Sequence, residues 1–158
     1  MALRTILICV AGVVCVASAL TAPRSAPHAS APLLAGAHID APTLTLIQRS
    51  CSDCHSDATR YPWYSYVAPV SWLIQSDVRG GRARMNLSNW PQYSVIRRER
   101  YLSEIANQVK DRGMPLPLYI MIHRDAKLSD TAVNAIFDWT QTERLRLIEE
   151  TAASASRK

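Results

Sequence analysis

Apolar residues recur every three or four positions through most of the chain, and this spacing places them on one face of an α-helix. A first helix is expected to begin near Asp40 or Pro42, with Leu44, Ile47 and Cys51 along one face. No window alternates apolar and polar residues for long enough to predict a β-sheet. The pattern therefore predicts an all-α fold.

Proline and glycine mark the expected ends of two further helices. The second helix is expected to run from Pro69 to the pair Gly80-Gly81, and to bury Val70, Leu73, Ile74 and Val78. The third is expected from about Arg97 to Arg112, with Gly113 ending it. Its apolar stripe consists of Leu102, Ile105, Ala106 and Val109.

The last helix has the clearest start. Ser129 is the expected N-cap and Asp130 lies in the first turn. Leu128 and Val133 are placed to form a hydrophobic staple across this start. The expected apolar face comprises Val133, Ile136, Phe137, Thr140 and Ile148, with Trp139 at one margin.

The N-terminus has the layout of an export signal. Arg4 precedes an apolar run over residues 6–16, and the small residues Ala17-Ser18-Ala19 follow. We expect cleavage after Ala19, which makes residues 1–19 a signal peptide and the mature protein periplasmic. The apolar span 6–20 is shorter than the roughly 20 residues of a membrane-crossing helix, yet an uncleaved membrane tether is the alternative.

Composition divides the rest of the chain into three parts. Residues 20–39 are rich in Ala and Pro and are expected to form a disordered tether, in which His28 and His38 are solvated. Residues 40–150 are long enough for one domain with one core, and residues 151–158 are expected to be a frayed tail.

The chemistry is concentrated in the pentapeptide Cys51-Ser52-Asp53-Cys54-His55. Two thiols three residues apart can each bond one vinyl group of a haem, and the adjacent histidine can bind the iron. We therefore expect one covalently attached haem c in a small cytochrome c-like helical domain. The competing interpretations are a thioredoxin-like dithiol, a structural disulfide, half of a zinc site, or a chance match without functional meaning.

The sequence around this motif resembles the bacterial haem-binding domain family that carries a single C-x-x-C-H motif. The resemblance covers about residues 43–140 and rests on two stretches, CSDCHSDATRYPWYSYVAPVSWLIQSDVRGGRARMNLSNW and GMPLPLYIMIHRDAKLS. Membership implies a periplasmic c-type haem protein. Tyr61 and Arg124 depart from the tryptophan and proline expected at these positions, and the second departure affects the turn after His123.

The sixth iron ligand has two candidates. Met114 lies in a Gly-Met-Pro loop between two helices, where Pro115 would stiffen the chain and keep the sulfur on the iron. His123 is the competitor, because histidine is also a common iron ligand. Met85 and Met121 are expected to be packing or surface residues.

Aromatic residues gather after the motif, and some of them are expected to line the haem. Trp90 is the first choice as a donor to a haem propionate, since polar Asn86, Ser88 and Asn89 stand beside it. Ordinary core packing is the alternative role for Trp90.

Charge suggests the kind of partner. Residues 60–112 contain nine basic residues against four acidic ones. A basic surface near a haem edge would attract an acidic redox partner protein, although a solvated face is the simpler interpretation for most of these arginines. Nucleic acid is not an expected partner of an exported protein.

These observations predict a carrier of single electrons rather than an enzyme. A haem enzyme or ligand sensor is the alternative, and it requires a sixth iron position that is open or displaceable. Ligation by Met114 would favour electron transfer, and an open position would favour chemistry at the iron.

Overall fold

The computed structural model describes residues 2–23 and 32–156. Over these residues every regular element is helical, which confirms the all-α class. In chain order the elements are α1 (Ala2–Thr21), α2 (Ala41–Ser50), α3 (Ser52–His55), the 3-10 helix η1 (Trp63–Tyr66), α4 (Val70–Arg84), η2 (Leu87–Gln92), α5 (Val95–Lys110), α6 (Pro117–Ile122), η3 (Arg124–Ala126) and α7 (Asp130–Ala155).

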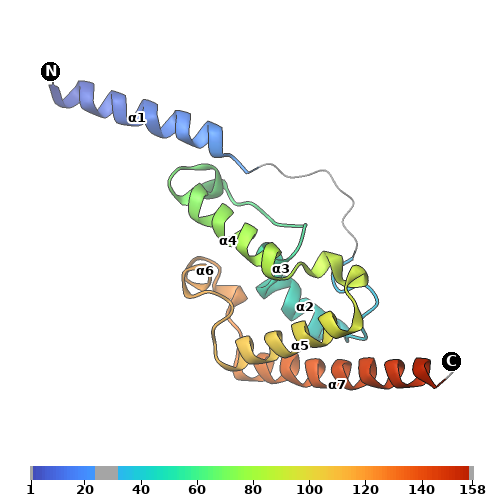
Figure 1. Ribbon diagram of the computed structural model, residues 1–158. Helices are drawn as coiled ribbons and strands as arrows, with labels where there is room; N and C mark the ends of the chain where they lie inside the picture. The colour runs from blue at the N-terminus through green and yellow to red at the C-terminus, as the bar shows by residue number, and fades with distance from the viewer. Residues whose placement is uncertain (1, 24–31, 157–158) are drawn as a thin grey trace.

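The core lies between α5 and α7, which run side by side along one edge of the fold (Figure 1). The stripe expected on α5 is confirmed, with Leu102, Ala106 and Val109 buried and Ile105 packed against the core. Trp90 from η2 and Ile136 from α7 are completely buried in the same cluster. Helix α2 packs on α7, and it also contacts α3, which in turn contacts α4.

Two helix starts agree with the sequence analysis. The Asp40 carboxylate caps α2 by accepting the N–H of Thr43 at 2.9 Å, and this bond lowers the pKa of Asp40. Ser129 caps α7 by accepting the N–H of Ala132 at 3.1 Å. Both ends of the predicted staple, Leu128 and Val133, are buried.

The predictions for α4 are partly wrong. The helix continues through Gly80 and Gly81 to Arg84, since its hydrogen bonding extends to the N–H of Met85. Val78 is buried as expected, but Val70 and Leu73 are 41% and 50% exposed. Ile74 is half-buried, so the first two turns of this face are only partly covered.

The buried face of α7 also differs from the prediction. Trp139 is buried and Ile148 is 55% exposed, because the helix packs along residues spaced three and four apart that end at Leu147. The helix continues to Ala155, so the described part of the expected tail is helical and exposed.

Residues 32–39, called the strap below, correct the expectation of a disordered tether. Leu34 is 2% exposed, and its N–H donates to the carbonyl of Leu87 at 3.1 Å. The carbonyl of His38 accepts the indole N–H of Trp139 at 2.9 Å, although the imidazole itself is exposed. The folded domain therefore begins at least six residues earlier than predicted, while His28 lies outside the described residues.

A buried carboxylate joins the strap to α7. Glu143 is 1% exposed and accepts the backbone N–H of His38 at 3.3 Å. Arg146 donates to both oxygens of Glu143 at 2.6 and 2.7 Å, and these bonds raise the pKa of the guanidinium. The charge of Glu143 is thus compensated within the core.

Helix α1 stands apart from this core (Figure 1). It has 20 residues, where the sequence analysis counted a shorter apolar span, and it is long and apolar enough to cross a membrane. Its residues 2–16 are all exposed. Only its C-terminal end reaches α4 and η1.

The burial of Leu34 leads to a first prediction. Leu34→Ala should lower the free energy of unfolding by about 2–5 kcal/mol, because it leaves a cavity in the core. Leu145→Ala is the matched control, since Leu145 is 61% exposed on α7. Urea unfolding of the two variants measures the difference. Equal midpoints would mean that the strap does not contribute to the core.

Candidate functional site

The α2–α3 junction positions the two cysteines. Cys51 links the helices, with its N–H bonded to the carbonyl of Ile47 at 2.9 Å. Its own carbonyl accepts the N–H of His55 at 2.9 Å, which closes one helical turn around the motif. Because Ile47 is buried in the core, the turn that carries Cys51, Cys54 and His55 is fixed to the domain.

Both thiols are free and half-buried. Burial raises the pKa of Cys51 to about 12, with the neighbouring Cys54 as a second cause. Burial also raises the pKa of Cys54 to about 11, and the negative charges of Asp77 and Asp53 are smaller causes of the same rise. A redox dithiol of the thioredoxin type has a lowered thiol pKa, so the environment here is the opposite of what that interpretation requires.

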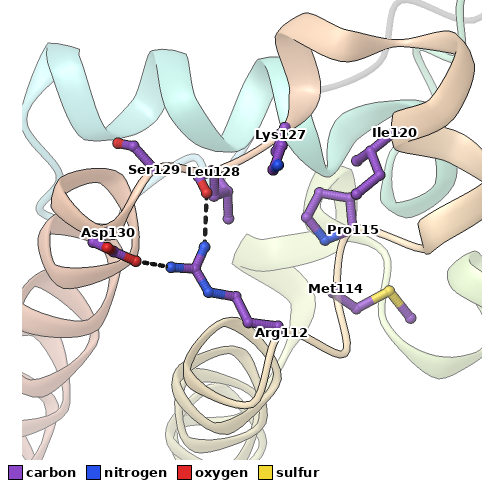
Figure 2. A pocket seen from close by; sticks show the side chains of 8 residues that line it. All are labelled: Arg112, Met114, Pro115, Ile120, Lys127, Leu128, Ser129 and Asp130. Atoms are coloured by element: carbon purple, nitrogen blue, oxygen red, sulfur yellow. Dashed lines mark hydrogen bonds and ion pairs between the residues drawn. The ribbon is translucent and has the colours of Figure 1, made fainter.

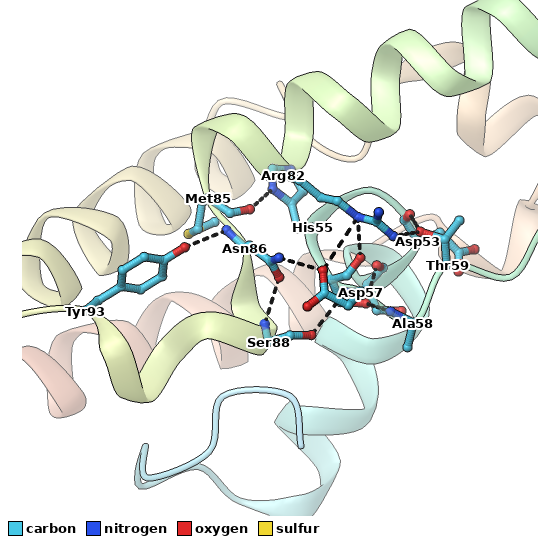
Figure 3. Close-up of polar contacts among 12 residues, drawn as sticks. Asp53, His55, Asp57, Ala58, Thr59, Arg82, Met85, Asn86, Ser88 and Tyr93 are labelled. Atoms are coloured by element: carbon cyan, nitrogen blue, oxygen red, sulfur yellow. Dashed lines mark hydrogen bonds and ion pairs between the residues drawn. The ribbon is translucent and has the colours of Figure 1, made fainter. Parts of the chain in front are cut away.

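The imidazole of His55 is oriented by backbone from another element (Figure 3). Its Nδ1 lies 3.0 Å from the carbonyl oxygen of Met85, directly after α4. A carbonyl only accepts, so Nδ1 carries the proton and Nε2 of the neutral ring has a free lone pair. This is the arrangement found around histidines that bind metals, where the second nitrogen donates to a carbonyl.

A polar network fixes the chain that follows His55 (Figure 3). Arg82 donates to the carbonyl of Ser56 at 2.8 Å and to the hydroxyl of Thr59 at 2.9 Å. The amide of Asn86 donates to Asp57 at 2.8 Å, and the N–H of Asp57 donates to Ser88. The end of α4 and the start of η2 therefore hold the chain directly after the motif.

Gly81 explains why α4 contains a glycine pair. A Cβ built on Gly81 would lie 2.6 Å from the carbonyl oxygen of Cys54, whereas one on Gly80 would meet nothing within 4 Å. Only a residue without a side chain allows α4 to approach the motif this closely. The sequence analysis interpreted the pair as a helix end, and contact with Cys54 is its actual role.

Asp53, inside the motif, connects it to α6. This carboxylate is 8% exposed, and it accepts the hydroxyl of Tyr119 at 2.8 Å and the N–H of Arg60 at 3.2 Å. Burial and the bond to Asp53 raise the pKa of the Tyr119 phenol. Neither Asp53 nor Tyr119 was singled out from the sequence. An acidic residue between two cysteines that face the core could have indicated that a hydrogen-bond donor from another element lies beside it.

His123, the competing iron ligand, has both ring nitrogens engaged. Nε2 lies 2.9 Å from the hydroxyl of Tyr64, and Nδ1 lies 3.2 Å from the carbonyl of Tyr119. The ring also stacks on Tyr119 with 4.2 Å between centroids. His123 is therefore a structural residue between α6 and η1 in this structure.

Met114 is half-buried beside a cavity of about 500 Å³ (Figure 2). The cavity is lined by Arg112, Met114, Pro115, Ile120, Lys127, Leu128, Ser129 and Asp130. Arg112 spans it by donating to the carbonyl of Leu128 at 2.7 Å and pairing with Asp130. None of these residues belongs to the motif, so the structure does not bring Met114 and His55 into one site.

Trp90 has a buried donor without a partner. Its side chain is fully buried and meets the ring of Tyr93 edge-on at 6.4 Å. The indole Nε1 has no hydrogen-bond acceptor among the described residues, and the same holds for the hydroxyl of Ser50 next to Cys51. Unpartnered buried donors are rare in folded proteins and often indicate a ligand or water.

An apolar surface extends from the motif along α4. Val70, Leu73 and Ile74 precede Gly81 at helical spacing, so they share the face that approaches Cys54. Leu118, Met121 and Ile122 on α6 are each more than 60% exposed. The donor set of two thiols and one imidazole, with apolar side chains along α4, fits a haem.

Comparison with known families gives a match. The model of a family described as "Haem-binding domain" matches residues 11–142. Comparisons with the curated proteins and with the solved structures give no match. The matched region includes the cysteine motif, Trp90, Met114 and all helices from α2 to α6. The chain therefore belongs to the haem-binding domain family.

Proposed function

We propose that the chain is an exported c-type haem protein that transfers single electrons. Cys51 and Cys54 would form the thioether bonds to one haem, and His55 would bind the iron on one side. When bound, such a haem supplies an iron that changes between the ferric and ferrous states. The proposed location is the periplasm, where the N-terminal apolar segment would direct the chain.

The observation that carries this proposal is the bond between His55 and Met85. It fixes the ring and leaves Nε2 as a lone-pair donor on a turn that also presents two free thiols. Family membership gives the haem, and the position of the thiols beside the imidazole argues for covalent attachment.

The unpartnered N–H of Trp90 supports a role in the same site. Helix η2 contacts α3, so Trp90 belongs to the element that lies next to the motif. We assign its indole N–H, as a proposal, to a haem propionate. A charged acceptor would offset the cost of burying this donor.

Met114 is the proposed sixth ligand because both nitrogens of His123 have partners. Its loop lies between α5 and α6, and α6 is tied to the motif through Tyr119 and Asp53. The loop would have to bring the thioether to the iron when haem is bound. A methionine there favours ferrous iron and raises the reduction potential.

A basic hollow is the proposed docking place for an acidic redox partner. It measures about 410 Å³, and its charged lining consists of Arg84, Arg97, Arg100 and Glu104. Arg84 directly precedes Met85, whose carbonyl bonds His55. A negatively charged protein docked here would therefore lie close to the proposed iron ligand.

Covalent attachment is tested by removing the thiols. The double variant Cys51→Ala, Cys54→Ala should lose all haem that survives denaturing gel electrophoresis, because no thioether can form. The control variant Cys9→Ala, Cys15→Ala should keep it, since these cysteines lie in α1. Haem staining of the gel gives the result. Haem retained by the first variant would refute thioether attachment at this motif.

The close approach of α4 gives a matched pair of variants. Gly81→Ala should reduce the yield of haem-attached protein severalfold, because the new methyl group would displace the carbonyl of Cys54. Gly80→Ala should keep the yield and can raise stability by up to about 1 kcal/mol through helix propensity. Absorbance of the haem band per unit protein measures the yield. Equal yields would show that the contact does not position the motif.

Axial ligation distinguishes an electron carrier from an enzyme. Met114→Ala should keep the attached haem, lose the weak charge-transfer band of the ferric protein and lower the reduction potential. Met121→Ala is the control, because Met121 is 69% exposed. Spectra and potentiometry report both effects. An unchanged potential, with rapid cyanide or carbon monoxide binding by the wild type, would instead indicate an open iron site and a haem enzyme or sensor.

A further inference from the structure

The end of α1 is part of the folded domain. Residues 2–16 are exposed, but Ala17, Ser18, Thr21 and Ala22 are half-buried and Pro23 is buried. The helix thus changes from free to partly covered within its last two turns, where Ala19 and Leu20 are still exposed. A signal peptide that is removed after export makes no lasting contact with the exported domain, so contacts of this kind are not expected for it.

Hydrogen bonds define this contact. The hydroxyl of Ser18 accepts the N–H of Ala68 at 3.0 Å. The hydroxyl of Thr21 lies 3.1 Å from that of Ser71, which is fully buried, and the amide of Gln75 donates to the carbonyl of Thr21. The expected cleavage bond, Ala19–Leu20, lies between the two bonded residues. Cleavage there would require this turn to open first.

Helix α1 as a whole has the length and composition of a membrane span, and its free part, residues 2–16, makes up about 22 Å of that length. Twenty helical residues measure about 30 Å, the thickness of the hydrocarbon core. Arg4 lies at the end that would remain in the cytoplasm. At the opposite end, η1 contacts α1 and exposes Trp63 and Tyr66, and Trp72 on α4 is 50% exposed. Tryptophan and tyrosine are enriched where protein meets the membrane surface.

The geometry points to α1 as a retained membrane anchor whose last turn is docked on α4 and η1. The docked turn would keep the haem domain against the outer face of the membrane, instead of on a loose tether. The family match begins at residue 11, inside α1, so half of this helix belongs to the region shared with the family. The inference replaces cleavage after Ala19 and rests on the export part of the proposed function.

Retention is tested on the full chain with a C-terminal tag, expressed with a haem-attachment system. The tag should remain in the membrane fraction after an alkaline carbonate wash, and the mass should include residues 1–19. A soluble chain that begins at Leu20 would overturn the inference. The tag reports membrane retention whether or not haem is attached, so failure of the haem assignment is seen separately by haem staining.

Docking is tested by cross-linking in a Cys9→Ala, Cys15→Ala background. Thr21→Cys with Ser71→Cys should form a disulfide in isolated membranes and resist a maleimide reagent until reduced. Thr21→Cys with Ser76→Cys is the matched control, because Ser76 is exposed on another face of α4. Its two thiols should react at once. Equal protection of both pairs, or of neither, would overturn the docked arrangement. If haem is not attached, the free thiols of Cys51 and Cys54 would each react with the maleimide, so two additional labels would reveal the missing haem.

Discussion

The site depends on one hydrogen bond, between Nδ1 of His55 and the carbonyl of Met85. Met85 also donates its N–H to Gly81, and Gly81 approaches the carbonyl of Cys54. The end of α4 therefore contacts the motif twice. Gly81 lies against the carbonyl of Cys54, and the carbonyl of Met85 bonds the imidazole of His55. A carbonyl at a helix end is available for such a bond because it has no partner within the helix.

The rest of the structure fixes the motif from the outside. Arg82 and Asn86 bind the chain after His55, and Tyr119 binds Asp53 from α6. These partners come from different parts of the fold, so the conformation of the short helix α3 is stabilised mainly by tertiary contacts and little by its own four residues. The orientation of the imidazole is set by tertiary contacts and not by helix propensity.

The sequence predicted the features that depend on local chemistry. The caps at Asp40 and Ser129 and the stripe of α5 follow from side chains a few residues apart, and the structure confirms them. The strap and Gly81 were misinterpreted because their roles depend on contacts with distant residues, Leu87 and Cys54. Proline and alanine around Leu34 resemble a linker, and only the partner surface shows that the segment packs. The thiols and imidazole were recognised from spacing, but the acceptor for His55 lies 30 residues away.

The pairing of Glu143 with the strap has a consequence for the accuracy of folding. An apolar contact such as that of Leu34 tolerates a shift by one residue, because neighbouring Leu33 is also apolar. Glu143 makes a directional contact, since one of its oxygens receives the N–H of His38 while the guanidinium of Arg146 bonds both oxygens. Buried ion pairs add little net stability, and this one lies within α7, so the contact that a misaligned strap would lose is the bond from the N–H of His38. The carboxylate thus adds a directional requirement to the alignment of the strap, which an apolar contact does not supply.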